Sequence, residues 1–154
     1  MPILNQTDVV KWAQLASFID GEGTIRIASH ARLHGRGSSP RHYLSVIITN
    51  TDVLLMQWLR VNFGACVFSV TTPKGHRQMF RWMANSRQAE TIIRGCLPYF
   101  IIKRRQAEIA LAFASLPVNT RGVKVSPETV AVREGFRQQM KAANATGNSP
   151  AIIQ

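Results

Sequence analysis

Hydrophobic residues change their spacing along the chain, and the changes predict the first elements. Apolar side chains recur every three or four positions over about residues 8–20, which predicts a helix. From Thr24 onward apolar and polar residues alternate, which predicts a strand with a basic polar edge. A Gly-, Ser- and Arg-rich turn at 34–40 and a second strand at 43–49 complete a predicted hairpin.

The same order of elements then repeats. Residues 50–52 offer N-caps for a second helix, which Gly64 ends. Strands at 66–72 and 78–83 flank a Pro-Lys-Gly turn and predict a second hairpin. A third helix follows over 85–95. The repetition predicts two hairpins side by side in one four-stranded antiparallel sheet, with helices on one face only.

The rest of the chain is predicted to be helical and then disordered. A helix over about 98–115 has apolar positions at Ile102 and further along, and Pro117 ends it. Another helix is predicted over about 127–143, followed by a Gly-, Asn-, Ser- and Pro-containing end. We therefore expect an α+β fold of order αββαββα over residues 1–117, and a C-terminal helical extension with a disordered end over residues 118–154.

Size and composition favour one intracellular domain. The chain has 154 residues, enough for one core. Neither a membrane-spanning segment nor a signal peptide is evident, so we expect no membrane partner and no secretion. Cys66 and Cys96 lie in apolar stretches away from other metal ligands, which predicts buried free thiols.

The charge points to a polyanionic partner. The chain carries 19 Lys and Arg against eight Asp and Glu, a net charge of +11, and 14 of the basic residues are arginine. No acid lies between Glu22 and Asp52 or between Asp52 and Glu90, so the first ninety residues build most of the basic surface. Arginine pairs with phosphate and with the guanine edge, which favours nucleic acid. An RNA-binding protein of the ribosomal type would have a similar charge.

One short motif makes the interpretation specific. Residues 15–23 read LASFIDGEG, with Leu-Ala, two acids and two glycines in register, followed by Thr24-Ile25. This segment resembles the signature of the LAGLIDADG homing endonucleases, with Ser17 in place of a glycine and Glu22 in place of an aspartate. The strand end at 48–52, the LPYF run with its following basic residues and the αββαββα order support the resemblance, which covers about residues 8–116.

The resemblance implies a catalytic site. Glu22 corresponds to the family's catalytic acid, which with the backbone of Gly23 implies ligands for Mg²⁺ (or Mn²⁺). Asn50 corresponds to a polar residue that orders water, although it is also suited to cap a helix. Lys103 corresponds to a basic residue of the site's rim, although an ordinary exposed lysine is the alternative. A second basic residue of some relatives is missing, since Leu54 takes its place.

A lone motif also implies a homodimer, because one copy supplies one catalytic carboxylate. Small side chains along the first helix allow a second backbone to approach closely. The expected interface comprises Ala13, Ala16, Ser17, Asp20 and Gly21.

Alternation of side chains predicts which residues would contact double-stranded DNA. For the first hairpin they are Thr24, Arg26, His30, Arg32, Arg41, Tyr43 and Ser45. For the second hairpin they are Ser69, Thr71, Arg77 and Arg81. Any one arginine can instead contact phosphate without reading sequence.

The resemblance thus implies an intron-encoded, site-specific endonuclease that cuts a long pseudo-palindromic DNA site in both strands, leaving 3′ overhangs. The alternative is a non-catalytic RNA maturase or DNA-binding regulator with the same fold, and host intron RNA is a further expected partner. Bacterial cytoplasm and an organelle, chloroplast or mitochondrion, are left open as locations.

Overall fold

The computed structural model describes residues 6–30, 39–118 and 123–145. Its elements are α1 (Gln6–Glu22), β1 (Gly23–His30), β2 (Arg41–Asn50), α2 (Val53–Phe63), β3 (Cys66–Val70), β4 (Met79–Asn85), α3 (Ser86–Cys96), the short 3₁₀ helix η1 (Leu97–Tyr99), α4 (Arg104–Ala114) and α5 (Pro127–Ala145). The predicted α+β order is confirmed. The predicted disordered end, from residue 146, lies outside the described residues.

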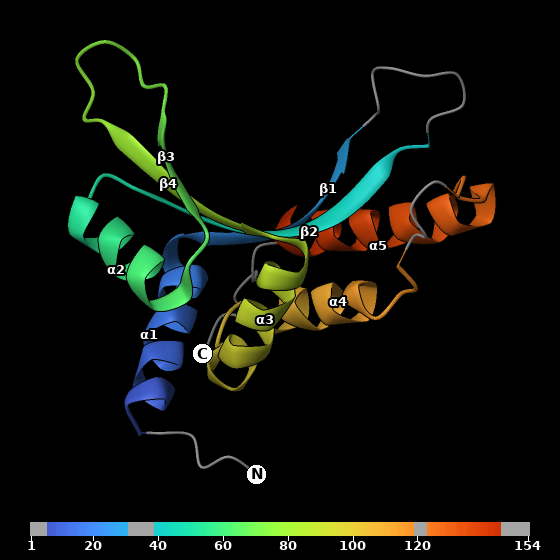
Figure 1. The fold of residues 1–154 in the computed structure, drawn as a ribbon, viewed down its shortest axis with the longest axis horizontal. Coiled ribbons are helices and arrows are strands. Elements are labelled where there is room, and N and C mark those ends of the chain that lie inside the picture. Colours follow the sequence, from blue (N-terminus) through green and yellow to red (C-terminus); the bar gives the residue numbers. More distant parts are fainter. Residues whose placement is uncertain (1–5, 31–38, 119–122, 146–154) are drawn as a thin grey trace, which may run out of the picture.

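The four strands form one antiparallel sheet of order β1-β2-β4-β3. Figure 1 shows the two hairpins rising as separate arms from the middle of the sheet, with the helices gathered beneath it. One face of the sheet is therefore covered by helices. We call the other, uncovered face the open face.

The core lies between the sheet and the helices. Alternation places Ile25 and Ile27 of β1 on the covered face, where each is at most 4% exposed. Trp82 of β4 is fully buried on the same face, and its indole nitrogen donates to the Gly64 carbonyl at 2.8 Å. Leu15 and Ile19 of α1 pack into this cluster. Burial of one apolar stripe on each element fixes which side of the sheet the helices occupy.

The C-terminal helix α5 belongs to the same core. Met140 is 1% exposed and packs within the main cluster. The Asn144 amide donates to the Ile25 carbonyl of β1 at 3.0 Å. Nε2 of the buried His42 on β2 lies 2.8 Å from the Glu134 carboxylate of α5. The extension is thus fastened to the first hairpin by apolar and polar contacts.

Two local predictions are wrong. The expected continuous helix over 98–115 is interrupted: α4 begins only at Arg104, and Ile102, expected in the core, is 46% exposed.

Cys66 is exposed rather than buried, because it lies on the open face at the start of an edge strand, whereas Cys96 is buried as expected. Burial also raises the pKa of the Cys96 thiol to about 12.

Among the described residues, no helix combines the length and hydrophobicity needed to cross a membrane.

Candidate active site and nucleic-acid interface

Glu22 stands at the point where α1 turns directly into β1. The next residue, Gly23, is buried, and a Cβ there would lie 2.6 Å from the Ile19 Cα. Real side chains do not tolerate so short a contact with backbone, so this position requires glycine. The tight junction leaves the Glu22 side chain exposed at the end of the helix.

Asn50, at the end of β2, contacts Glu22 directly. Its amide nitrogen donates to Glu22 Oε2 at 2.5 Å, and its side-chain oxygen accepts from the Asp52 backbone N–H at 2.8 Å. The helix cap is Asp52, whose carboxylate accepts from Leu54 and Leu55. The structure therefore assigns the capping role to Asp52 and brings Asn50 to the predicted catalytic acid.

Lys103 reaches the same end of α1 from the start of α4. Its ammonium group donates to the Asp20 backbone carbonyl at 2.7 Å. Burial lowers the pKa of the Lys103 ammonium, and the nearby Asp20 carboxylate acts against that shift. We use "the junction" for Asp20, Glu22, Asn50 and Lys103, which meet where α1 ends.

The junction offers part of a divalent-metal site. Mg²⁺ is often held by one or two carboxylates, with water and phosphate oxygens as the other ligands. Glu22 supplies one exposed carboxylate, and Oε1 has no hydrogen-bond partner in the described part of the chain. No group of three or more His, Cys, Asp or Glu side chains suited to a metal occurs among the described residues. The donor set fits a magnesium site that is completed by ligands from outside this chain.

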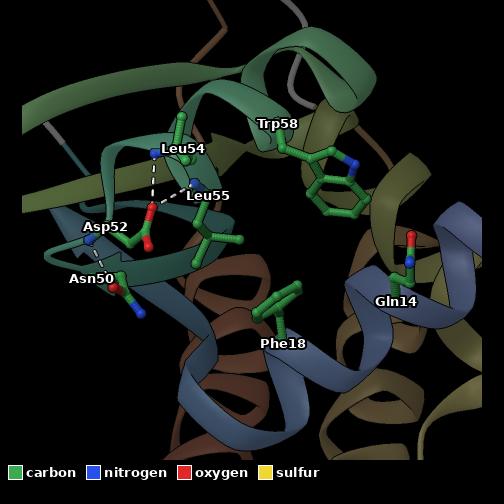
Figure 2. A pocket seen from close by; sticks show the side chains of 7 residues that line it. All are labelled: Gln14, Phe18, Asn50, Asp52, Leu54, Leu55 and Trp58. Carbon is green, nitrogen blue, oxygen red and sulfur yellow. Dashed lines mark hydrogen bonds between the residues drawn. The ribbon is translucent and has the colours of Figure 1, made fainter.

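A pocket of about 460 Å³ opens beside the junction, between α1 and α2. Figure 2 shows Phe18 and Gln14 projecting from α1 and Trp58 from α2, with Asn50 and Asp52 at one end. Leu54 also lines it and is 74% exposed, so the position of the missing basic residue carries an exposed apolar side chain.

The predicted dimer residues differ in their surroundings. Ala16 is fully buried among core residues, so its placement at the interface is wrong. The reason is that Ala16 lies next to Leu15 and Ile19 on the stripe of α1 that faces the sheet. Ser17 and Gly21 are exposed, and a Cβ on Gly21 would meet nothing within 4 Å. Ala13 is half-buried, and Asp20 is bonded within its own chain.

On the first hairpin, most of the residues predicted to contact DNA lie on the open face. Thr24, Arg26, His30 and Arg41 are exposed, and Tyr43 is half-buried. The Tyr43 hydroxyl lies 2.9 Å from His30 Nε2, and the two rings stack at 5.3 Å. Arg32 lies outside the described residues.

Ser45 also points to this face but is fully buried, so its predicted contact with DNA is wrong. It lies on a central strand, paired with Arg26 of β1 and Asn85 of β4. Its hydroxyl has no hydrogen-bond partner among the described residues.

In the second hairpin, one prediction has the wrong phase. Arg81 is on the open face, where its Nε donates to Thr49 Oγ1 at 3.3 Å. Ser69 pairs with Phe80, which faces the core, so Ser69 lies on the opposite side. Thr71 and Arg77 are exposed but lie beyond the strands.

Thr49, Phe68 and Met79 also lie on the open face, although sequence reasoning did not predict them there. Arg81 of β4 pairs with Phe68 of β3 on one side and with Thr49 of β2 on the other. Met79 lies two positions before Arg81 on β4, so it faces the same way. Phe68 is 39% and Met79 36% exposed. The alternation around the buried Trp82 could have revealed Met79, but the phase of the short edge strand β3 has no comparable signal.

The structure resembles several solved nucleases. The homing endonuclease I-CvuI, in complex with its target, is similar with a TM-score of 0.74 at 20% identity, covering 90% of this chain and 85% of that one. The archaeal intron-encoded homing endonuclease I-Vdi141I, complexed with DNA, is similar with a TM-score of 0.69 at 14% identity, covering 87% and 84%. The LAGLIDADG homing endonuclease I-GzeII, in complex with its DNA target, has a TM-score of 0.57 at 18% identity, covering 89% of this chain and 44% of that one.

No protein-family model matches the sequence, and no curated protein sequence matches it significantly. The structural likeness shows that the chain has the LAGLIDADG homing-endonuclease fold.

Proposed function

We propose that this chain, which has the fold of the LAGLIDADG homing endonucleases, is itself a site-specific DNA endonuclease that uses Mg²⁺ and acts as a homodimer. The observation that carries the proposal is the contact of Asn50 with Glu22, since a helix motif and a strand 28 residues apart meet in one polar site. A fold alone does not fix an activity, so the argument rests on this site.

The open face supplies the DNA-binding surface. Arg26 of β1 and Arg41 of β2 are exposed on this face, and Arg81 of β4 lies half-buried on the same face. A strand ribbon of this kind fits the major groove, where arginine recognises guanine or phosphate. The structures of I-CvuI and I-Vdi141I with DNA support this use of the fold.

The junction supplies the reaction site. Glu22 would hold the divalent metal, with Gly23 contributing backbone, and Asn50 fixes one carboxylate oxygen while the other stays available. When bound, Mg²⁺ supplies Lewis-acid stabilisation and an activated water for phosphodiester hydrolysis. Lys103 brings a positive charge to the rim, where it would neutralise the phosphate. I-CvuI bound to DNA has been solved in the presence of Mg or Ca, which supports a divalent ion.

The homodimer follows from the incomplete donor set. One chain carries one such carboxylate, and a twofold axis beside α1 would bring a second Glu22 to the same place. Exposed apolar side chains on α1 and α2 favour burial there: Val10 is 49%, Leu54 is 74% and Val61 is 82% exposed. A symmetric dimer would recognise a pseudo-palindromic site and break both strands, with the 3′ overhangs of the family.

The test begins with recovery of a cleavable site from a randomised DNA library. Wild-type protein with Mg²⁺ should then linearise a plasmid that carries this site, while Glu22→Gln should bind the site without cutting it. Glu108→Gln is the matched control, because Glu108 is an exposed carboxylate on α4 whose ion pair among the described residues is with Arg104. Equal cutting by Glu22→Gln and wild type would refute the assignment of Glu22.

The oligomeric state is tested separately by light scattering of the protein–DNA complex. Two copies per site are expected. A complex with a single copy that still cuts both strands would contradict the homodimer.

A further inference from the structure

The interruption before α4 has a structural cause in a distant residue. The chain leaves the 3₁₀ helix at Tyr99, and α4 starts at Arg104, so residues 100–103 are not helical. Lys103 is the N-cap residue of α4, but its side chain makes no capping hydrogen bond. The backbone N–H groups of this non-helical segment need acceptors from elsewhere.

Asp20 of α1 provides these acceptors. Its Oδ2 accepts from the Ile101 backbone N–H at 2.8 Å, and its Oδ1 accepts from the Lys103 backbone N–H at 2.9 Å. Both carboxylate oxygens are thus used on one short segment, 81 and 83 residues away in the sequence. A carboxylate with two backbone donors holds that segment in one conformation, because charge-assisted hydrogen bonds are strong and directional.

A hydrogen bond from the Lys103 side chain back to Asp20 completes the contact between the two segments. The Lys103 ammonium donates to the backbone carbonyl of Asp20 at 2.7 Å, near the C-terminal end of α1. Carbonyls at a helix C-terminus lack helical partners and carry partial negative charge, which favours an ammonium there. Three hydrogen bonds therefore join Asp20, at the end of α1, to the segment just before α4.

We propose that Asp20 is the positioning residue for Lys103, holding its ammonium at a fixed place beside the helix end that carries Glu22. This inference rests on the proposed endonuclease function, in which Lys103 acts at the rim of the site. Asp20 lies two residues before Glu22, so the same helix end presents the carboxylate and fixes the cation. Asp20 does not touch the DNA or the metal in this proposal, and it acts on the reaction only through Lys103.

A purely structural role for Asp20 would give a different result. Loss of the Asp20 carboxylate destabilises the segment in either case, so a lower melting temperature does not distinguish the roles. Two quantities do distinguish them. One is the cleavage rate with all DNA bound, and the other is the dependence of that rate on Lys103.

The experiment compares wild type, Asp20→Asn, Lys103→Ala and the double variant in single-turnover cleavage at saturating protein, below the melting temperature of every variant. Asp20→Asn should lower the rate about 10- to 100-fold, as expected for a misplaced catalytic group, with DNA affinity changed less than about threefold. In the Lys103→Ala background, Asp20→Asn should lower the rate by less than about twofold. Asp20→Ser, which retains one short acceptor, replaces Asp20→Asn if the latter does not fold.

A readout independent of cleavage tests the contact itself. Amide hydrogen exchange at Ile101 and Lys103 should become at least about tenfold faster in Asp20→Asn, while Glu108→Gln leaves both rates unchanged. Unchanged exchange at these amides would overturn the inference, as would independent, multiplicative effects of Asp20→Asn and Lys103→Ala on the rate. Failure of wild type to cut any site is a different result, since it would refute the proposed function and leave the exchange measurement standing.

Discussion

The junction and the open face differ in how their polar side chains are held. At the junction, Asn50 is bonded to Glu22, and Lys103 is bonded to Asp20. On the open face, Arg26 and Arg41 are exposed and have no side-chain partner within the described residues. The junction is fixed before any ligand arrives, whereas these two arginines of the open face keep their donors free.

The two regions have different physical requirements. Chemistry at a phosphate needs groups held to within about 0.5 Å, which internal hydrogen bonds provide. Recognition of DNA needs donors that exchange water for phosphate or base, which internal partners would prevent. The chain therefore places its bonded groups where elements meet and its free cations along the strands.

The largest predicted effect concerns the backbone that builds the junction. Gly23→Ala should lower the free energy of unfolding by about 3 kcal/mol, because the added methyl overlaps the Ile19 backbone. Gly21→Ala is the matched control, since a Cβ there meets nothing within 4 Å and alanine favours a helix by about 0.5–1 kcal/mol. Urea unfolding of both variants measures the difference. Equal stability of the two would mean that the junction is not as tight as described.

Asn50 tests the bonded side chains of the junction. Asn50→Ala should slow single-turnover cleavage about 10- to 100-fold, because the Glu22 carboxylate loses the group that orients it. Asn62→Ala removes an amide of similar type, which donates to Trp58 on α2 away from the junction, and should leave the rate unchanged. If both variants cut at the wild-type rate, fixation of Glu22 by Asn50 is unimportant for the reaction.

Arg26 tests the free cations of the open face. Arg26→Ala should weaken DNA binding about fivefold, roughly 1 kcal/mol, with little change in the rate at which bound DNA is cleaved. If Arg26 contacts phosphate, the slope of log affinity against log salt should fall by about 0.9. Arg94→Ala is the control with the same loss of charge, since Arg94 lies on α3, on the covered side, and pairs with Glu90. Equal effects of the two variants would show that net charge alone is being measured.

The smallest predicted effect lies beneath the first hairpin, where α5 meets β2. The hydrogen bond with His42 lowers the pKa of the Glu134 carboxyl to about 2, with help from Gln138 and Arg137. A carboxyl with a depressed pKa stabilises the fold above its unfolded value, and that contribution disappears as the pH falls from about 4.5 to about 2. Glu134→Gln should therefore lower the melting temperature at pH 7, and the difference from wild type should vanish near pH 2. A difference that stays constant across this range would contradict the assignment.

Much of the fold was predictable because its signals are local. The alternation of Ile25 and Ile27 fixes the covered face of β1, and the three- and four-residue spacing fixes α1. The glycine at position 23 is required by the geometry of its own neighbours. Such patterns depend on residues a few positions apart, so a single sequence contains them.

The site was predictable only in part. The motif pointed to Glu22, and alternation pointed to Arg26 and Arg81, but neither predicted that Ser45 is buried or that Ser69 faces the other way. Burial of a side chain on a central strand depends on both neighbouring strands. The phase of a short edge strand depends on its register with one partner.

Local patterns in the chain are enough to predict the order of the elements, the helix that ends in Glu22 and the basic character of the first ninety residues. No such pattern predicts that Asp52 caps α2, that Asn50 binds Glu22, or that Asp20 binds the backbone just before α4. The physical reason is that periodicity is set by near neighbours in the chain. The partner of a polar side chain is set by which distant backbone and side-chain groups the folded core brings within about 3 Å.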